Sequence, residues 1–233
     1  MAVSGQERVK LVPAKGPRVR MQRVLLGTAM DLMQRGLIPS VSEVAEAAEV
    51  SRATAYRYFP SQAALIQAAV NEALGPILDW TSSSPSAEER MADLLAFAYP
   101  RMERYEATLR AALWLALDHW ARLHAGTLGV EAQLVRGHRK GLIAEAMAPL
   151  RTRLSRKAFD RVMQSLSLIF GTEAIVVLKD IWGLDGEEAR RVAIWAANAL
   201  VRAATAEAAV IEKIRPARGG RTSAARKPRR KPT

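Results

Sequence analysis

The sequence contains no cysteine among its 233 residues. This absence excludes a disulfide scaffold, zinc or iron–sulfur centres bound through cysteine, and catalysis by a thiol. Of the three histidines, His119 and His124 are five residues apart, a poor spacing for binding one metal ion from a single helical face. There is also no glycine-rich phosphate loop and no nucleophile elbow. We therefore expect no catalytic residue, no metal and no cofactor, and we predict that the protein is not an enzyme.

Long apolar runs are also missing. The longest stretch without a charged residue covers 58–71 and is interrupted by Pro60 and Ser61. A membrane-spanning helix needs about 20 mostly apolar residues. The basic N-terminus is not followed by the apolar segment of a secretory signal. We predict a cytoplasmic protein with no membrane span.

The charge is concentrated at the two ends of the chain. There are 35 basic and 23 acidic residues, which give a net charge of +12. Residues 1–20 carry +4 and residues 215–233 carry +8, so the part between them is neutral. We predict a flexible basic arm over 1–18 and a disordered basic tail over 215–233. Such segments suit a polyanionic partner, although they could equally serve only to keep the protein in solution.

The segment between these ends shows helical periodicity and no strand pattern, which predicts an all-α fold. Three S/D-x-x-E patterns, Ser40–Glu43, Ser86–Glu89 and Asp185–Glu188, predict helix starts. Pro100 should break or kink its helix. We expect about nine helices, at 19–35, 41–48, 52–58, 61–75, 87–100, 101–124, 130–148, 156–181 and 187–213.

Residues 40–59 have the pattern of a helix-turn-helix, in which the second helix enters the major groove of DNA. The turn is expected at Glu49-Val50, with Val50 filling the gap between the helices. Ala45 is small, as a close crossing of the helices requires. Ala55 and Phe59 are four residues apart and are expected to face the core.

The other side chains of the second helix are left to face outward. Arginine can bridge the acceptors of guanine, and a threonine or alanine methyl can touch thymine. Tyrosine hydroxyls typically bond phosphates, and the free N–H groups of the helix that Ser61 opens could hold another. The outward set on 52–58 is Arg52, Ala53, Thr54, Tyr56, Arg57 and Tyr58.

Over about 20–72 the sequence resembles the TetR family of bacterial transcriptional regulators. The resemblance rests on Arg35-Gly36, Ser40-Val41, Val44-Ala45, the run Val50-Ser51-Arg52-x-Thr54-x-Tyr56-x-Tyr58-Phe59-Pro60-Ser61, and Ala64-Leu65. It implies a three-helix DNA-binding domain at 19–75 and a helical effector-binding and dimerisation domain at 76–214. The DNA-binding residues it implies are Ser42, Arg52, Ala53, Thr54, Tyr56, Arg57 and Tyr58. We add Ser51 and Ser61, which begin the second helix and the one after it, to the predicted DNA-binding set.

The chain departs from the family pattern at four positions. Glu49 stands where the turn usually has glycine, which tolerates a positive φ more readily. Ala53 replaces another frequent glycine, and Tyr58 replaces a frequent histidine. Gln62 replaces a frequent lysine, so one phosphate interaction typical of the family is not expected here.

The C-terminal part carries no family motif, so its roles are predicted from composition. The segments 156–181 and 187–213 are apolar on more than one side, which predicts a four-helix homodimer interface; an intramolecular core is the alternative. Aromatic and polar residues mix in 97–120, typical of a ligand pocket, although an aromatic core is the simpler interpretation. The candidate pocket residues are Phe97, Arg110, Trp114, His119 and Trp120.

The sequence thus predicts a ligand-responsive dimeric repressor, released from a palindromic DNA operator by a small apolar or aromatic effector. Two alternatives stay open: the C-terminal domain binds a protein instead of a small molecule, or the basic tail makes the chain a non-specific nucleic-acid binder. Residues 21–75 carry four basic and five acidic side chains. Because DNA affinity requires phosphate neutralisation, we expect residues 8–20 to supply cations from the flank.

Overall fold

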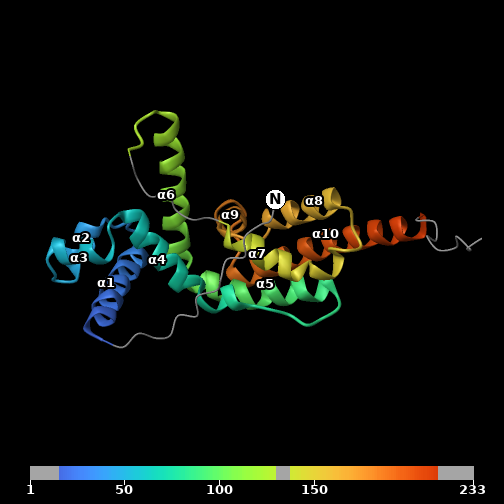
Figure 1. Ribbon diagram of the computed structural model, residues 1–233, viewed down its shortest axis with the longest axis horizontal. Coiled ribbons are helices and arrows are strands. Elements are labelled where there is room, and N and C mark those ends of the chain that lie inside the picture. The colour runs from blue at the N-terminus through green and yellow to red at the C-terminus, as the bar shows by residue number, and fades with distance from the viewer. Residues whose placement is uncertain (1–15, 130–136, 215–233) are drawn as a thin grey trace, which may run out of the picture.

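The computed structural model describes residues 16–129 and 137–214, with the backbone alone for 211–214. Every regular element in these ranges is helical, which confirms the all-α prediction (Figure 1). The ten α-helices are α1 (Pro17–Gln34), α2 (Val41–Ala47), α3 (Arg52–Tyr58), α4 (Gln62–Leu74), α5 (Ala87–Arg104), α6 (Glu106–His124), α7 (His138–Ala146), α8 (Arg156–Ser167), α9 (Thr172–Val176) and α10 (Gly186–Ile214).

Helices α1–α4 form one end of the molecule (Figure 1). Leu25, Ala29 and Met33 recur along one face of α1 and are buried, as the periodicity predicted. This face packs against α2 and α4, while α3 packs on α2. The short helices α2 and α3 therefore pack on apolar residues that belong to one core, which continues into the rest of the molecule.

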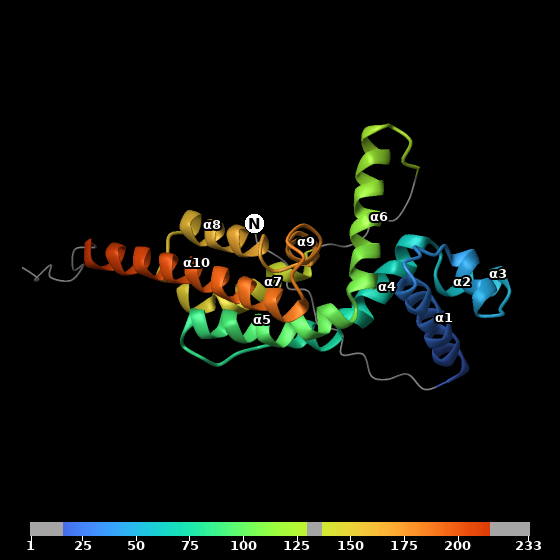
Figure 2. The same cartoon turned by 180° about the vertical axis from the view of Figure 1, so that it is seen from behind.

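Helices α5, α7, α8 and α10 form an elongated body, in which α5 and α10 make the most extensive contact (Figure 2). The buried face of α10 is built mostly from small side chains, which allow close approach of α5. Helix α6 projects away from the body and contacts α4, α1 and α9. The buried α10 residues are Ala189, Ala193, Ala197, Val201, Ala204 and Ala208.

Two helix boundaries differ from the sequence predictions. Pro100 lies inside α5, which continues to Arg104. A proline inside a helix costs about 3 kcal/mol, and burial of Ala98, Tyr99 and Met102 around it favours the continuous helix. The break falls instead at Tyr105, between α5 and α6.

The expected single helix 156–181 is split into α8 and α9, so ten helices replace nine. A helix that ends leaves carbonyl groups that need donors. Here the Arg139 guanidinium donates to Ser167 O, at 2.9 Å, and the Tyr99 hydroxyl donates to Ile169 O, at 3.1 Å. Gly171 then opens α9, which passes into a π-helical turn at Val177–Ile181.

No single helix in the described ranges combines the length and apolarity needed to cross a bilayer. One bent pair, α8 with the segment 172–181, meets the criterion on length and composition alone. The basic arm and the basic tail lie outside the described residues, except for 16–18 of the arm, as does the first part of the helix expected at 130–148.

Candidate nucleic-acid interface and cavity

The helix-turn-helix is held by side-chain caps at the start of each helix. Ser40 accepts a hydrogen bond from Glu43 N, and Glu43 accepts one from Ser40 N at 2.6 Å, which completes the predicted capping box. These two bonds lower the pKa of Glu43. Ser51 and Ser61 cap α3 and α4 in the same way, by accepting from the backbone N–H three residues on.

The turn between α2 and α3 keeps a left-handed conformation although it lacks glycine. Glu49 has φ of 54°, the only positive φ at a non-glycine position among the described residues. Val50 N donates to Ala45 O at 2.9 Å, and the Val50 side chain packs against the core, as predicted. Ala45 and Ala55 are fully buried where the helices cross. The Glu49 backbone is thus strained by this turn.

The predicted DNA-contacting residues belong to α2, to α3 and to the residues that cap α3 and α4. Arg52, Ala53, Tyr56 and Arg57 are exposed, and Thr54 is partly buried. The Ser51 hydroxyl donates to Thr54 Oγ1 at 2.9 Å, which orients the threonine. Ser42 on α2 lies beside Tyr56, with 3.4 Å between Oγ and OH, while Ser61 is partly buried in its capping role.

Two positions differ from a simple outward-facing arrangement. Tyr58 is partly buried and packs against the core, with the Arg57 guanidinium over its ring at 5.7 Å. Tyr58 belongs to α3, as predicted, but its ring also contributes to the packing of the core. Gln62 donates from Nε2 to Ile38 O and Pro39 O, at 3.1 and 3.2 Å. It therefore ties the start of α4 to the loop before α2.

Positive and negative side chains lie on different parts of this surface. Neither Arg52 nor Arg57 pairs with a carboxylate within the described part of the chain, so both charges face outward. The exposed carboxylates Glu46 and Glu49 lie on the α2 side. The surface can therefore place two arginines against phosphate or base edges, while the carboxylates on the α2 side add negative charge.

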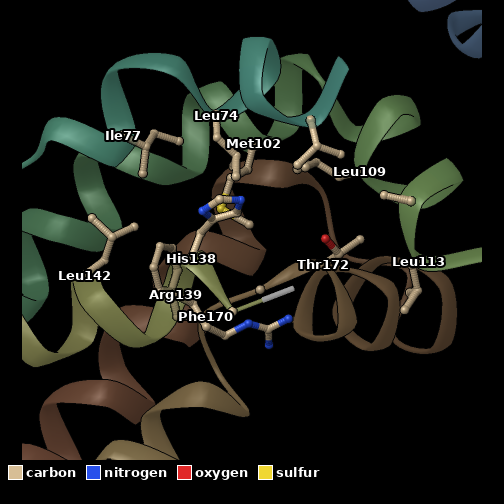
Figure 3. A pocket seen from close by; sticks show the side chains of 14 residues that line it. Leu74, Ile77, Met102, Leu109, Leu113, His138, Arg139, Leu142, Phe170 and Thr172 are labelled. Atoms are coloured by element: carbon tan, nitrogen blue, oxygen red, sulfur yellow. The ribbon is translucent and has the colours of Figure 1, made fainter. Parts of the chain in front are cut away.

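A cavity of about 110 Å³ lies where α4, α5, α6, α7 and the start of α9 meet. Its lining is mostly apolar, and the polar side chains among the described lining residues are His138, Arg139 and Thr172 (Figure 3). The remaining lining residues are Val70, Leu74, Ile77, Met102, Leu109, Ala112, Leu113, Gly137, Leu142, Phe170 and Gly171.

The five residues predicted for a pocket do not line this cavity. Phe97, Trp114 and Trp120 are exposed by 48, 48 and 60%. His119 has a buried Nε2 that finds no hydrogen-bond partner within 16–129 and 137–214, but it lies further along α6. The sequence signal for the cavity was Gly171-Thr172, since a glycine inside an apolar run marks a break or a close approach.

Arg110, the fifth predicted pocket residue, holds α6 to the π-helical turn instead. It donates to both carboxylate oxygens of Asp180 at 2.6 Å and to Glu106 at 2.8 Å. Lys179 donates to Glu106 at 2.7 Å. The hydrogen bonds to Asp180 raise the pKa of Arg110, and the same bonds lower the pKa of Asp180. We call these four residues the α6–π clamp.

Comparison with known proteins agrees with this geometry. Residues 25–69 match the family model described as bacterial regulatory proteins, tetR family. The fold is similar to the crystal structure of a tetR-family transcriptional regulator from Streptomyces coelicolor: the TM-score is 0.53 at 19% identity, covering 84% of this chain and 96% of that one. A Mesorhizobium loti structure named for the same family gives a TM-score of 0.49 at 16% identity, covering 83% of this chain and 98% of that one. No curated protein matches the chain in sequence.

Proposed function

We propose that this chain, whose residues 25–69 match the tetR family model, is a homodimeric DNA-binding repressor that a small molecule releases from a palindromic operator. The reading surface is the set predicted from the sequence, with Arg52, Thr54, Tyr56 and Arg57 at its centre. Two copies of this surface in a dimer would read two half-sites about 34 Å apart, or at a multiple of that spacing.

The observation that carries the proposal is the position of α4. Its first residue, Gln62, is hydrogen-bonded to the loop before α2, while its later residues Val70 and Leu74 line the cavity. Its C-terminal end is fixed to α5, because Arg101 donates to Ala73 O at 2.7 Å and to Glu72 O at 2.8 Å. A ligand that favours one position of α4 would therefore bias the position of α2 and α3.

Selection of bound sequences from random DNA tests the reading surface. We expect the wild type to enrich one palindrome. A Tyr56→Phe/Thr54→Ala variant should bind it more weakly, because neither substituted side chain can form a hydrogen bond with DNA. The buried control Thr108→Val lies on α6, away from the interface, and should select the same palindrome. Failure of the wild type to enrich any palindrome would refute the proposal.

The homodimer is supported by apolar side chains left exposed around the start of α10. Ile181, Trp182 and Trp195 are exposed by 73, 72 and 70%, and Val192 lies on the same helix as Trp195. Exposed apolar patches of this kind mark association sites in soluble proteins. The proposed interface corresponds to the predicted segments 156–181 and 187–213, with its apolar part near the π-helical turn.

Sedimentation analysis of two charge substitutions tests this interface. Trp195→Glu should dissociate the dimer, because a carboxylate would be buried without a partner. Leu117→Glu is the matched control on α6, where the replaced side chain is 59% exposed. Dissociation by Leu117→Glu but not by Trp195→Glu would contradict the proposed interface and place the contact on α6.

A second candidate function is binding of a partner protein by the C-terminal part. It is favoured by the outer half of α6, which stands clear of the body in Figure 1. Trp114, Leu117, Trp120 and Leu123 are all about half exposed there. If a small molecule never alters operator binding, this surface becomes the better explanation for the C-terminal domain.

A further inference from the structure

We infer that the cavity takes a small uncharged molecule of about one ring, carrying a single hydrogen-bonding group that His138 recognises. The inference rests on the proposed function, because it names the chemical class of the effector. The sequence predicted recognition by aromatic and charged residues within 97–120. The recognition residue inferred here is instead His138, in the first turn of α7.

The volume limits the size of the ligand. The cavity measures about 110 Å³, and a dry apolar cavity of about 150 Å³ in another protein holds benzene. Leucine, isoleucine, methionine, phenylalanine, valine and alanine side chains form most of the lining, so the body of the ligand must be apolar. The cavity is partly open to solvent, so a single six-membered ring or a short branched chain can bind with part of it at the mouth.

His138 supplies the recognition of a polar group. Its ring projects among Met102, Leu74 and Phe170 in Figure 3, and its Nε2 is buried without a hydrogen-bond partner among the residues that the structure describes. A buried polar atom left unpaired is costly, so a ligand that pairs with it gains affinity over one that does not. Thr108 and Asn198 also carry buried oxygens that have no partner in the described part of the chain, but neither residue lines the cavity.

Arg139 argues against a charged ligand. It is the one charged side chain among the described lining residues. Its guanidinium is already bonded to Ser167 O at 2.9 Å and to the Glu173 carboxylate at 2.6 Å. It also packs tightly against Gly171, where an added Cβ would lie 2.4 Å from Nη1. An anionic ligand would have to displace Glu173, and a cationic one would face Arg139.

Calorimetry on the full chain without DNA tests the ligand class with four probes: phenol, cyclohexanol, toluene and benzoate. We expect the wild type to bind phenol or cyclohexanol about tenfold more tightly than toluene, the effect of one buried hydrogen bond. Benzoate should bind more weakly than either. His138→Leu should abolish the preference for the hydroxyl compounds, and His138→Gln, which keeps a hydrogen-bonding group, should retain part of it. Thr108→Val removes a buried hydroxyl outside the cavity and should leave the preference unchanged.

The inference is overturned by equal binding of toluene and phenol, by tighter binding of benzoate, by no binding of any probe, or by an equal effect of Thr108→Val. DNA release is measured separately, by fluorescence anisotropy of a labelled operator. If the hydroxyl probes bind through His138 but leave operator binding unchanged, the ligand class holds and the proposed regulation fails. If only charged molecules release the operator, the regulation holds and the ligand class fails.

Discussion

Side chains that form hydrogen bonds with residues close to them in the sequence could be predicted. Ser40, Ser61 and Ser86 all cap helices where the sequence indicated, because a cap depends on residues only three positions apart. Gln62 was not predictable in this way. Its amide bonds carbonyl groups at positions 38 and 39, and that contact exists only once α4 has packed beside the loop before α2.

The strained turn at Glu49 yields a residue-scale prediction. Its φ of 54° disfavours any side chain with a Cβ. Glu49→Gly should therefore raise the free energy of unfolding by about 0.5–1 kcal/mol, since relief of this strain outweighs the added chain entropy. Urea denaturation of the full chain measures the change.

The neighbouring residue provides the control for this turn. Ala48 has φ of −90°, where glycine offers no relief. Ala48→Gly should destabilise the protein by at least about 0.5–1 kcal/mol, through added chain entropy and through loss of the contact that the Ala48 methyl group makes with the core. Equal shifts of the same sign in both variants would show that the backbone of Glu49 is not strained.

At the scale of elements, helix existence was predictable and helix continuity was not. Pro100 is a strong local breaker, yet α5 continues past it because burial on both sides favours one helix. The 156–181 segment is apolar on several sides and its pattern predicts one helix, yet it breaks at 168–171. The donors that satisfy this break come from Tyr99 and Arg139, which are distant in sequence. Local patterns do not contain that information.

The break between α8 and α9 yields an element-scale prediction. Gly171→Ala would place a methyl group 2.4 Å from Arg139 Nη1. We expect the free energy of unfolding to fall by about 1–3 kcal/mol, because the guanidinium must leave partners that are partly buried. Gly27 lies at an exposed position of α1 with open space around it. Gly27→Ala should instead raise the free energy of unfolding by about 0.5–1 kcal/mol.

Thermal and urea unfolding of these two glycine variants measure the difference. The pair separates a specific contact from the general effect of glycine on helices. Stabilisation by both substitutions would mean that Arg139 can move away at no cost, and that it does not hold the break in place.

The α6–π clamp yields a prediction on pH and salt. Arg110 lowers the pKa of Asp180, so the contribution of this pair is present above the unfolded pKa of about 3.8. It is lost as the pH falls through the lower pKa of the folded state. A double-mutant cycle with Arg110→Ala and Asp180→Ala should give favourable coupling at pH 7 that decreases in high salt and at low pH. Coupling that is unchanged by salt would contradict an ionic clamp.

At the scale of the whole molecule, the DNA-binding end was predictable and the cavity was not. The helix-turn-helix is encoded in 20 consecutive residues, 40–59, whose caps, turn and apolar positions act locally. The cavity is formed by residues between positions 70 and 172. The periodicity of apolar residues along each helix does not indicate where the helices meet. Arg110 and Trp114 looked suitable from composition, but packing placed them at an ion pair and at the surface.

The distribution of charge leads to a prediction about the whole chain. Residues 21–75 carry a net charge of −1 and present Glu46 and Glu49 beside the reading surface. Operator affinity should therefore depend on cations from the basic N-terminal segment. Deleting residues 1–17 removes Arg8, Lys10 and Lys15 and should weaken operator binding. It should also reduce the slope of log K against log salt, by about 0.9 for each phosphate that the arm neutralises.

The matched control is deletion of 215–233, which removes eight basic residues from the other end of the chain. We expect this deletion to lower affinity for bulk competitor DNA while preserving preference for the operator, because the tail carries charge but no reading surface. Anisotropy titrations at several salt concentrations distinguish the two deletions. An unchanged salt slope after removal of 1–17 would mean that the helix-turn-helix neutralises its phosphates without the N-terminal arm.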